Sequence, residues 1–264
     1  MRGFGEIGER LRRSTAQVFS GDQRGCGSGV IWSADGLILT NAHVARAADA
    51  RVELWDGRRF EARVVSRDSR RDLAALRIAA GGLEAATPGD SAALHPGELV
   101  MAIGNPLGFV GALSTGVVHS IGPLRGMGNQ RWIRASVRLA PGNSGGPLAN
   151  ARGEVIGLNT AIVNGLGVAA PISASIDFLK QGARPALGAT LRPVGFGLLI
   201  LDLEPGGAAF GASLRAGDIL LSSMDELSDT LDSGQDVVRL KFLRGNQKHV
   251  REVSVRLPAR AEAA

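Results

Sequence analysis

The chain has 264 residues and a formal net charge of +5, and 44% of its residues are hydrophobic. That length fits one large domain with one small one, and the hydrophobic fraction is ample for a buried core. The arginines are spread along the chain without a nucleic-acid-binding motif, so the charge favours a mixed surface over a nucleic-acid face. The single cysteine, Cys26, excludes an internal disulfide and a cysteine-rich metal site.

The N-terminal residues bear on location. Residues 1–13 have no apolar core of a secretory signal, and no stretch approaches the roughly 18 apolar residues of a membrane helix. We therefore expect no membrane span, and the cytoplasm is the default location. The alternative is the periplasm or cell envelope, which applies if the sequence as given lacks an export signal.

Short elements separated by turns fill the first part of the chain. Apolar residues recur among charges over residues 6–19, which predicts an amphipathic helix leading into a strand. We interpret Gly27-Ser28-Gly29 as a turn, and Asp35-Gly36 and Asp56-Gly57 are hairpin signals. Strand candidates lie at residues 30–32, 37–40, 52–55, 63–66 and 73–78. So many hairpins without a long helix favour an antiparallel barrel.

A second series of strands follows a segment rich in alanine, glycine and proline, residues 79–97, which we interpret as the connection between two barrels. Strand candidates lie at residues 99–103, 114–120, 131–138, 146–148, 155–161 and 167–170. Residues 175–181 are expected to form a closing helix and residues 182–188 a linker. A smaller unit spans residues 186–258, and the tail at 259–264 is expected to fray.

Three segments carry residues suited to amide hydrolysis. A serine hydroxyl needs a base to take its proton, and a carboxylate must hold that base in the right tautomer. Ser144 lies in a glycine-rich segment, so the N–H groups of Gly142 and Ser144 can point at one spot and receive an oxyanion. His43 follows an apolar strand and Asp72 precedes one, which suits a rigid base and a partly buried acid.

The order of these residues discriminates between folds. Gly142-x-Ser144-x-Gly146 alone also fits the nucleophile turn of α/β-hydrolases. In that fold, however, the serine precedes the acid and the histidine. Here His43 and Asp72 precede Ser144, which is the chymotrypsin order.

The three segments read Thr-Asn-Ala-His-Val, Asp-x-x-x-Asp-Leu-Ala-x-Leu and Pro-Gly-Asn-Ser-Gly-Gly-Pro-Leu, and they resemble the signature segments of HtrA/DegP proteases. Residues 102–108 and 114–118 resemble two further landmarks of that family. The resemblance covers residues 26–180. It implies a mainly β protein with a chymotrypsin-like double six-stranded antiparallel β-barrel at residues 21–182, preceded by a helical segment at residues 1–20.

The same resemblance assigns site residues. His43, Asp72 and Ser144 become base, acid and nucleophile, and the oxyanion hole falls on Gly142 and Ser144 with Asn143 between them. Gly167-Val168-Ala169-Ala170-Pro171 stands where the family has Gly-Phe-Ala-Ile-Pro. Val168, Ala169 and Ala170 would then line an apolar pocket that accepts small or medium aliphatic side chains.

Residues 186–258 resemble the PDZ domains attached to HtrA proteases, although the segment after Leu221 is trimmed. Residues 225–231 would form the helix beside the groove, and residues 237–243 and 250–257 the last strands. The loop Ala186-Leu187-Gly188-Ala189 would capture a peptide C-terminus. A purely structural role for this α+β unit is the alternative.

These observations predict an ATP-independent serine endopeptidase that acts on unfolded or damaged proteins without a cofactor or a metal. The alternative is a proteolytically silent chaperone or peptide-binding scaffold on the same fold. The resemblance also implies a homotrimer, packed through N-terminal residues such as Phe4 and Phe19.

Overall fold

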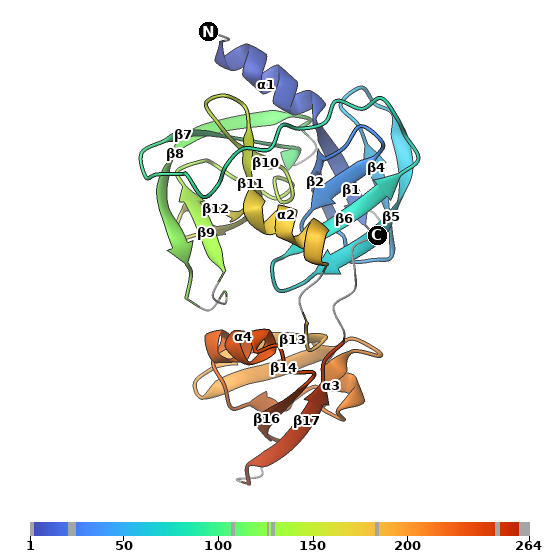
Figure 1. The fold of residues 1–264 in the computed structure, drawn as a ribbon, viewed down its shortest axis with the longest axis vertical. Coiled ribbons are helices and arrows are strands. Elements are labelled where there is room, and N and C mark those ends of the chain that lie inside the picture. The colour runs from blue at the N-terminus through green and yellow to red at the C-terminus, as the bar shows by residue number, and fades with distance from the viewer. Residues whose placement is uncertain are drawn as a thin grey trace. The chain divides into compact units, whose positions relative to one another are not determined.

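The computed structural model describes residues 3–20, 25–106, 109–125, 127, 130–182, 185–245 and 249–258. The chain divides into two compact units (Figure 1). Among the described residues, the first unit holds residues 3–122 and 131–182, and the second holds residues 123–130 and 185–258.

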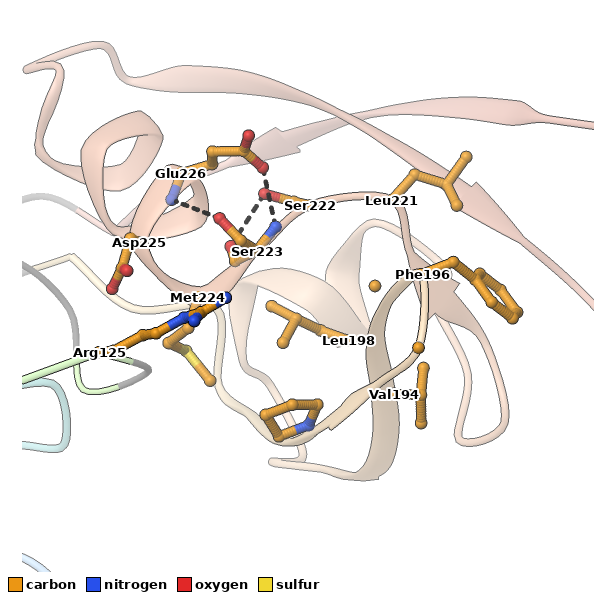
Figure 2. A pocket seen from close by; sticks show the side chains of 13 residues that line it. Arg125, Val194, Phe196, Leu198, Leu221, Ser222, Ser223, Met224, Asp225 and Glu226 are labelled. Atoms are coloured by element: carbon orange, nitrogen blue, oxygen red, sulfur yellow. Dashed lines mark hydrogen bonds between the residues drawn. The ribbon is translucent and has the colours of Figure 1, made fainter.

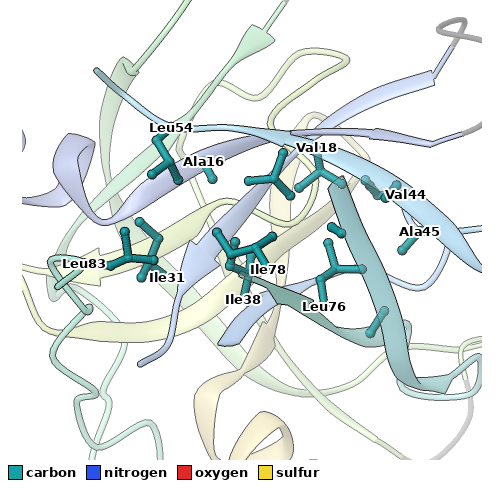
Figure 3. Close-up of a cluster of buried hydrophobic side chains, with 14 residues drawn as sticks. Ala16, Val18, Ile31, Ile38, Val44, Ala45, Leu54, Leu76, Ile78 and Leu83 are labelled. Atoms are coloured by element: carbon teal, nitrogen blue, oxygen red, sulfur yellow. The ribbon is translucent and has the colours of Figure 1, made fainter. Parts of the chain in front are cut away.

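The first barrel closes in the order β1-β2-β3-β6-β5-β4. Its strands are β1 (Thr15–Ser20), β2 (Gly25–Ile31), β3 (Leu37–Thr40), β4 (Asp49–Glu53), β5 (Arg59–Asp68) and β6 (Leu73–Ile78). Both predicted hairpin turns are present, with Gly36 at φ +97° and Gly57 at φ +84°, a conformation that favours glycine. Aliphatic side chains from these strands fill the interior, with Val18, Ile38 and Leu76 fully buried (Figure 3).

The second barrel repeats this arrangement in the order β10-β11-β12-β9-β8-β7. Its strands are β7 (Leu99–Gly104), β8 (Ala112–Pro123), β9 (Arg131–Ala135), β10 (Pro147–Asn150), β11 (Val155–Val163) and β12 (Leu166–Pro171). Val100, Ile133, Leu148 and Ile156 belong to its buried core. The expectation of a mainly β fold with two six-stranded antiparallel barrels is confirmed.

Two helices pack against strands of both barrels. Helix α1 (Phe4–Arg13) contacts β1 and β7, and it buries Ile7 and Leu11. Helix α2 (Ile172–Gln181) contacts β6, β11 and β12, and it buries Phe178. These contacts hold the two barrels together, so loops from both of them can build one site. Within the described chain, no helix is long and apolar enough to cross a membrane.

In its described residues, the second unit is a five-stranded sheet in the order β13-β14-β15-β16-β17 with two helices. Its elements are β13 (Ala189–Val194), β14 (Gly197–Leu203), α3 (Ala208–Gly211), β15 (Ile219–Leu220), α4 (Met224–Asp232), β16 (Val237–Leu243) and β17 (Arg251–Arg256). Leu198, Leu227, Val238 and Val255 lie in its separate core. The α+β unit expected at residues 186–258 is therefore compact in its own right.

Some sequence interpretations need correction. Gly27-Ser28-Gly29 lies within β2 rather than in a turn, since Gly29 pairs with Ala16 of β1. Strand β13 begins at Ala189, at the end of the predicted carboxylate loop, in a segment where the sequence predicts no strand. Leu187 of the expected linker is buried in the core of the second unit. The expected tail at 259–264 lies outside the described residues.

Candidate active site

His43 and Asp72 form a pair of two hydrogen bonds at the edge of the first barrel. His43 stands in the turn after β3, and its Nδ1 lies 2.7 Å from Asp72 Oδ2. The backbone N–H of His43 donates to the other carboxylate oxygen, Oδ1, at 2.9 Å. The carboxylate therefore holds both the ring and the backbone of the histidine. The histidine side chain is 41% exposed, so its other face remains accessible to a substrate.

The turn between β5 and β6 presents Asp72 in an unusual conformation. Its φ of +53° lies in the left-handed region, which non-glycine residues adopt rarely and at some cost. Asp68, at the end of β5, stabilises this turn because its Oδ1 accepts the N–H groups of Arg70 and Arg71 at 3.0 and 2.9 Å. Asp68 is almost fully buried. The first Asp of the Asp-x-x-x-Asp segment thus shapes the turn that carries the second.

Asn41 joins the acid to the second barrel. Its Nδ2 donates to the carbonyl oxygen of Asp72 at 2.8 Å and to Thr160 Oγ1, on β11, at 3.1 Å. The Ser144 hydroxyl donates to the carbonyl oxygen of the same threonine at 3.2 Å. The structure therefore brings His43, Asp72 and Ser144 together around Asn41 and Thr160, two residues to which sequence reasoning gave no role.

Ser144 lies in a tight turn before β10 that only glycine-rich sequence can form. Gly142 has φ +105° and Gly145 has φ +84°. A Cβ on Gly145 would lie 2.1 Å from the carbonyl oxygen of Ser28, so no larger residue fits there. The turn is closed by hydrogen bonds from Gly145 N–H to Asn159 O and from Asn159 N–H to Gly146 O, both 2.8 Å. Two peptide bonds of β11 thus hold the serine segment.

The three residues assigned to the oxyanion hole differ in their hydrogen bonds. The N–H of Asn143 donates to Ala140 O at 3.0 Å and is therefore engaged within the turn. The N–H groups of Gly142 and Ser144 donate no hydrogen bond to any of the described residues. The geometry favours the flanking pair, rather than the middle residue, as donors to a substrate oxygen.

The residues predicted for the specificity pocket are inaccessible in this structure. Val168, Ala169 and Ala170 on β12 are at most 1% exposed, and Ala169 belongs to the core of the second barrel. Leu139 is a partly buried neighbour that sequence reasoning missed. Its Cγ and Cδ1 lie 3.3 and 3.1 Å from the position that a Cβ on Gly167 would take. Leu139 therefore packs over Gly167 and against the core of the second barrel, and the three-residue pocket stays a prediction.

In the second unit, the loop predicted to bind a carboxylate is tied to its own domain. Leu187 O accepts the N–H of Ala209 and Gly188 O accepts the N–H of Glu204, both at 2.8 Å. Glu204 Oε2 lies 3.5 Å from the position of a Cβ on Gly188. Binding of a peptide C-terminus at Ala186 to Ala189 therefore stays a prediction.

A cavity of about 490 Å³ lies elsewhere in this unit, at the turn between β13 and β14 and the first turn of α4 (Figure 2). Leu198 and Met224 are among its apolar lining residues, and Asp225 and Glu226 are among its acidic ones. Ser223 caps α4, since its Oγ accepts the N–H of Glu226 at 3.2 Å. The segment between Leu221 and α4, which is trimmed in the sequence, forms one side of this cavity.

Two closed six-stranded antiparallel barrels, with a His–Asp pair on one and a glycine-flanked serine on the other, define the class of chymotrypsin-like folds. The family model described as "Trypsin-like peptidase domain" matches residues 27–158, half of the chain. The chain belongs to the trypsin-like peptidases, and within them to the HtrA/DegP family.

Individual relatives support this membership. A protein of Halomonas elongata named "Probable periplasmic serine endoprotease DegP-like" is 38% identical over 268 residues, which cover 88% of this chain and 56% of the relative. The chain thus spans little more than half the length of that protein. The solved structure of the HtrA-type protease AlgW with a decapeptide has a TM-score of 0.64 at 27% identity and covers 98% of this chain and 99% of that one. A serine endoprotease structure from Yersinia pestis also has a TM-score of 0.64 at 27% identity, covering 97% and 98%.

Proposed function

We propose that the chain is a serine endopeptidase with His43 as base, Asp72 as acid and Ser144 as nucleophile. The observation that carries the proposal is the pair of hydrogen bonds between His43 and Asp72, 2.7 Å at Nδ1 and 2.9 Å at the backbone N–H of His43. Thr160 and Asn41 link this pair to Ser144, which lies in a glycine-rich turn. The names of its relatives, which are serine endoproteases, support the same activity.

The proposed reaction follows the acyl-enzyme route. Asp72 accepts the Nδ1–H of His43, which leaves Nε2 free to take the Ser144 proton as Oγ attacks the scissile carbonyl carbon. The N–H groups of Gly142 and Ser144 receive the negative charge that develops on the carbonyl oxygen. His43 then gives its proton to the leaving amine, and a water molecule, activated by the same base, releases the acyl group from Ser144.

One observation favours the alternative of a proteolytically silent scaffold. The Ser144 hydroxyl donates to Thr160 O at 3.2 Å, and among the described residues it makes no hydrogen bond to His43. Rotation about the Cα–Cβ bond of Ser144 releases this contact, because a serine side chain moves between staggered rotamers. Catalysis therefore requires this rotation before the proton can pass to the histidine.

Labelling by a fluorophosphonate separates the two functions, since it requires an activated serine. Wild-type protein should label, Ser144→Ala should not, and Ser233→Ala, which removes an exposed serine hydroxyl of the second unit, should label like wild type. A folded wild-type protein that fails to label, or a Ser144→Ala variant within tenfold of wild-type peptidase activity, would refute the assignment.

The substrate class that we propose is unfolded or damaged protein, cleaved after small or medium aliphatic residues. The apolar segment Val168-Ala169-Ala170, which is predicted to line the specificity pocket, motivates this preference. Digestion of casein and of a tightly folded protein, followed by mapping of the cleavage sites, tests it. Cleavage mainly after charged residues, or equal rates on both proteins, would contradict the proposal.

The location and the assembly belong to the same proposal. The relative's name places it in the periplasm, and this favours the cell envelope over the cytoplasm for this chain. A homotrimer and the capture of peptide ends by the second unit remain predictions. Phe4 is 55% exposed on α1, which leaves an apolar side chain available for such a contact.

A further inference from the structure

A buried serine of the first barrel reaches the proposed oxyanion segment of the second. Ser28 of β2 is 0% exposed. Its Oγ donates to the carbonyl oxygen of Gly142 at 2.7 Å, and its backbone N–H donates to the carbonyl oxygen of Ser144, also at 2.7 Å. One residue thus holds the carbonyl groups of both proposed oxyanion donors.

The direction of the Ser28 hydroxyl hydrogen is determined by a second residue. The N–H of Asn105, directly after β7, donates to Ser28 Oγ at 2.9 Å. A hydroxyl has one hydrogen, so the hydrogen of Ser28 is left for Gly142 O. Asn105 is itself fixed, because its Oδ1 accepts the N–H of Gly111 at 3.0 Å and its Nδ2 donates to Ala16 O at 3.1 Å.

These contacts fix one peptide plane in the serine turn. The peptide between Gly142 and Asn143 accepts the Ser28 hydrogen at its C=O end and donates to Ala140 O, at 3.0 Å, from its N–H end. A planar peptide held at both ends cannot rotate without breaking a hydrogen bond. The plane lies between the N–H groups of Gly142 and Ser144, so its rotation would turn those groups away from a common point.

Ser28 is closely packed by the backbone of two glycines. A Cβ on Gly104 would lie 3.0 Å from Ser28 Oγ, and a Cβ on Gly146 would lie 3.2 Å from Ser28 Cβ. Loss of the hydroxyl would therefore leave Gly142 O buried without its donor, which is unfavourable. The Gly142 peptide would relax towards any orientation that finds another partner.

We propose that Ser28 is a positioning residue for the oxyanion hole, and that Asn105 orients its hydroxyl. The proposal rests on the proposed function. It gives a role to Ser28 in the Gly27-Ser28-Gly29 segment and to Asn105 in residues 102–108. The catalytic roles of His43, Asp72 and Ser144 explain neither residue. Ser28 contacts no substrate and acts only through the Gly142 peptide.

Ser28→Ala tests this role with a short peptide substrate. We expect kcat to fall about 10- to 100-fold, which is no more than the fall that follows removal of an oxyanion donor itself. KM should stay within about twofold of wild type. A peptide aldehyde, whose adduct with Ser144 places an oxyanion in the hole, should bind weaker by the same factor as kcat/KM falls. The unreactive peptide amide should bind both proteins alike. A general loosening of the fold would not produce this split.

Ser91→Ala is the matched control, because Ser91 is also a buried serine whose hydroxyl donates elsewhere, to Ser173 Oγ at 3.0 Å. It should keep wild-type kcat and aldehyde affinity. Wild-type labelling by the fluorophosphonate separates failure of the proposed function from failure of this inference. If wild type labels and folded Ser28→Ala retains full kcat and aldehyde affinity, Ser28 does not position the hole.

If Ser28→Ala fails to fold, Ser28→Cys keeps the side chain with a weaker donor. Its kcat should then lie at least about fivefold below wild type, with KM unchanged. A folded Ser28→Cys protein with wild-type kcat would overturn the proposal.

Discussion

Replacement of Asp72 by asparagine is the most direct test of the proposed acid, because the structure defines what each amide atom would meet. In the wild type, Asp72 Oδ1 accepts the backbone N–H of His43 at 2.9 Å and Oδ2 faces Nδ1 at 2.7 Å. Both partners are donors. Asparagine offers only one oxygen, so it can satisfy one of them.

Either orientation of the amide impairs the base. If the oxygen faces the backbone N–H, the amide nitrogen donates to Nδ1 and the ring must carry its hydrogen on Nε2. His43 then cannot take the Ser144 proton. If the oxygen faces Nδ1, two N–H donors oppose each other at 2.9 Å, and the histidine backbone is displaced. The first orientation costs no buried hydrogen bond and should prevail.

The expected loss in kcat is about 10⁴-fold, the size known for this substitution in a chymotrypsin-fold protease, and this corresponds to about 5.5 kcal/mol of activation free energy. Fluorophosphonate labelling and peptide turnover near neutral pH measure it, and circular dichroism checks the fold. Asp177→Asn, which changes an exposed carboxylate of α2, should leave both rates unchanged. A folded Asp72→Asn protein within about tenfold of wild-type kcat would refute the tautomer argument.

Three further predictions concern the second unit and its removal. Arg244→Ala should lower its free energy of unfolding by about 3 kcal/mol in urea-dependent proteolysis, because Asp218 is buried and loses the two guanidinium bonds of 2.8 and 2.7 Å. Burial alone would raise the pKa of Asp218, but Arg244 and the N–H of Arg215 hold it below its ordinary value. A carboxyl group whose pKa is lowered by folding stabilises the folded state at pH values above its unfolded-state pKa. The wild-type second unit should therefore lose stability below about pH 4, and the Arg244→Ala variant should lose less over the same range. Equal pH profiles of stability for the two proteins would contradict this. A chain ending at residue 182 should fold and label with the fluorophosphonate at the wild-type rate, because the barrels have their own cores, and a folded but unreactive truncation would contradict it.

Local sequence determined the elements of the barrels. Asp35-Gly36 and Asp56-Gly57 specify hairpin turns because the glycines adopt positive φ, and the predicted strand at residues 73–78 is β6 with the same bounds. The chemistry of the candidate site was equally accessible, since His43, Asp72 and Ser144 each stand in a short, recognisable segment. Their order along the chain, with His43 and Asp72 before Ser144, is that of the chymotrypsin fold and differs from that of the α/β-hydrolases.

Sequence reasoning was weaker wherever the function of a residue depends on a distant partner. Residues 168–170 have the composition of an apolar pocket and are buried in the second barrel, and their role in substrate specificity stays a prediction. Strand β13 is an edge strand with no fully buried residue. Its alternation of apolar and polar residues was therefore too weak to predict a strand.

Only the tertiary structure assigned the polar residues behind the site. Ser28 and Gly142 are separated by 114 positions, and Asn41 and Thr160 by 119. A hydroxyl or an amide has many possible partners in a sequence, and its hydrogen bond is decided by which strands the two barrels bring together. The sequence by itself therefore determined the reactive groups and the local turns that carry them, whereas the packing of one barrel on the other decided which buried polar groups hold those turns in place.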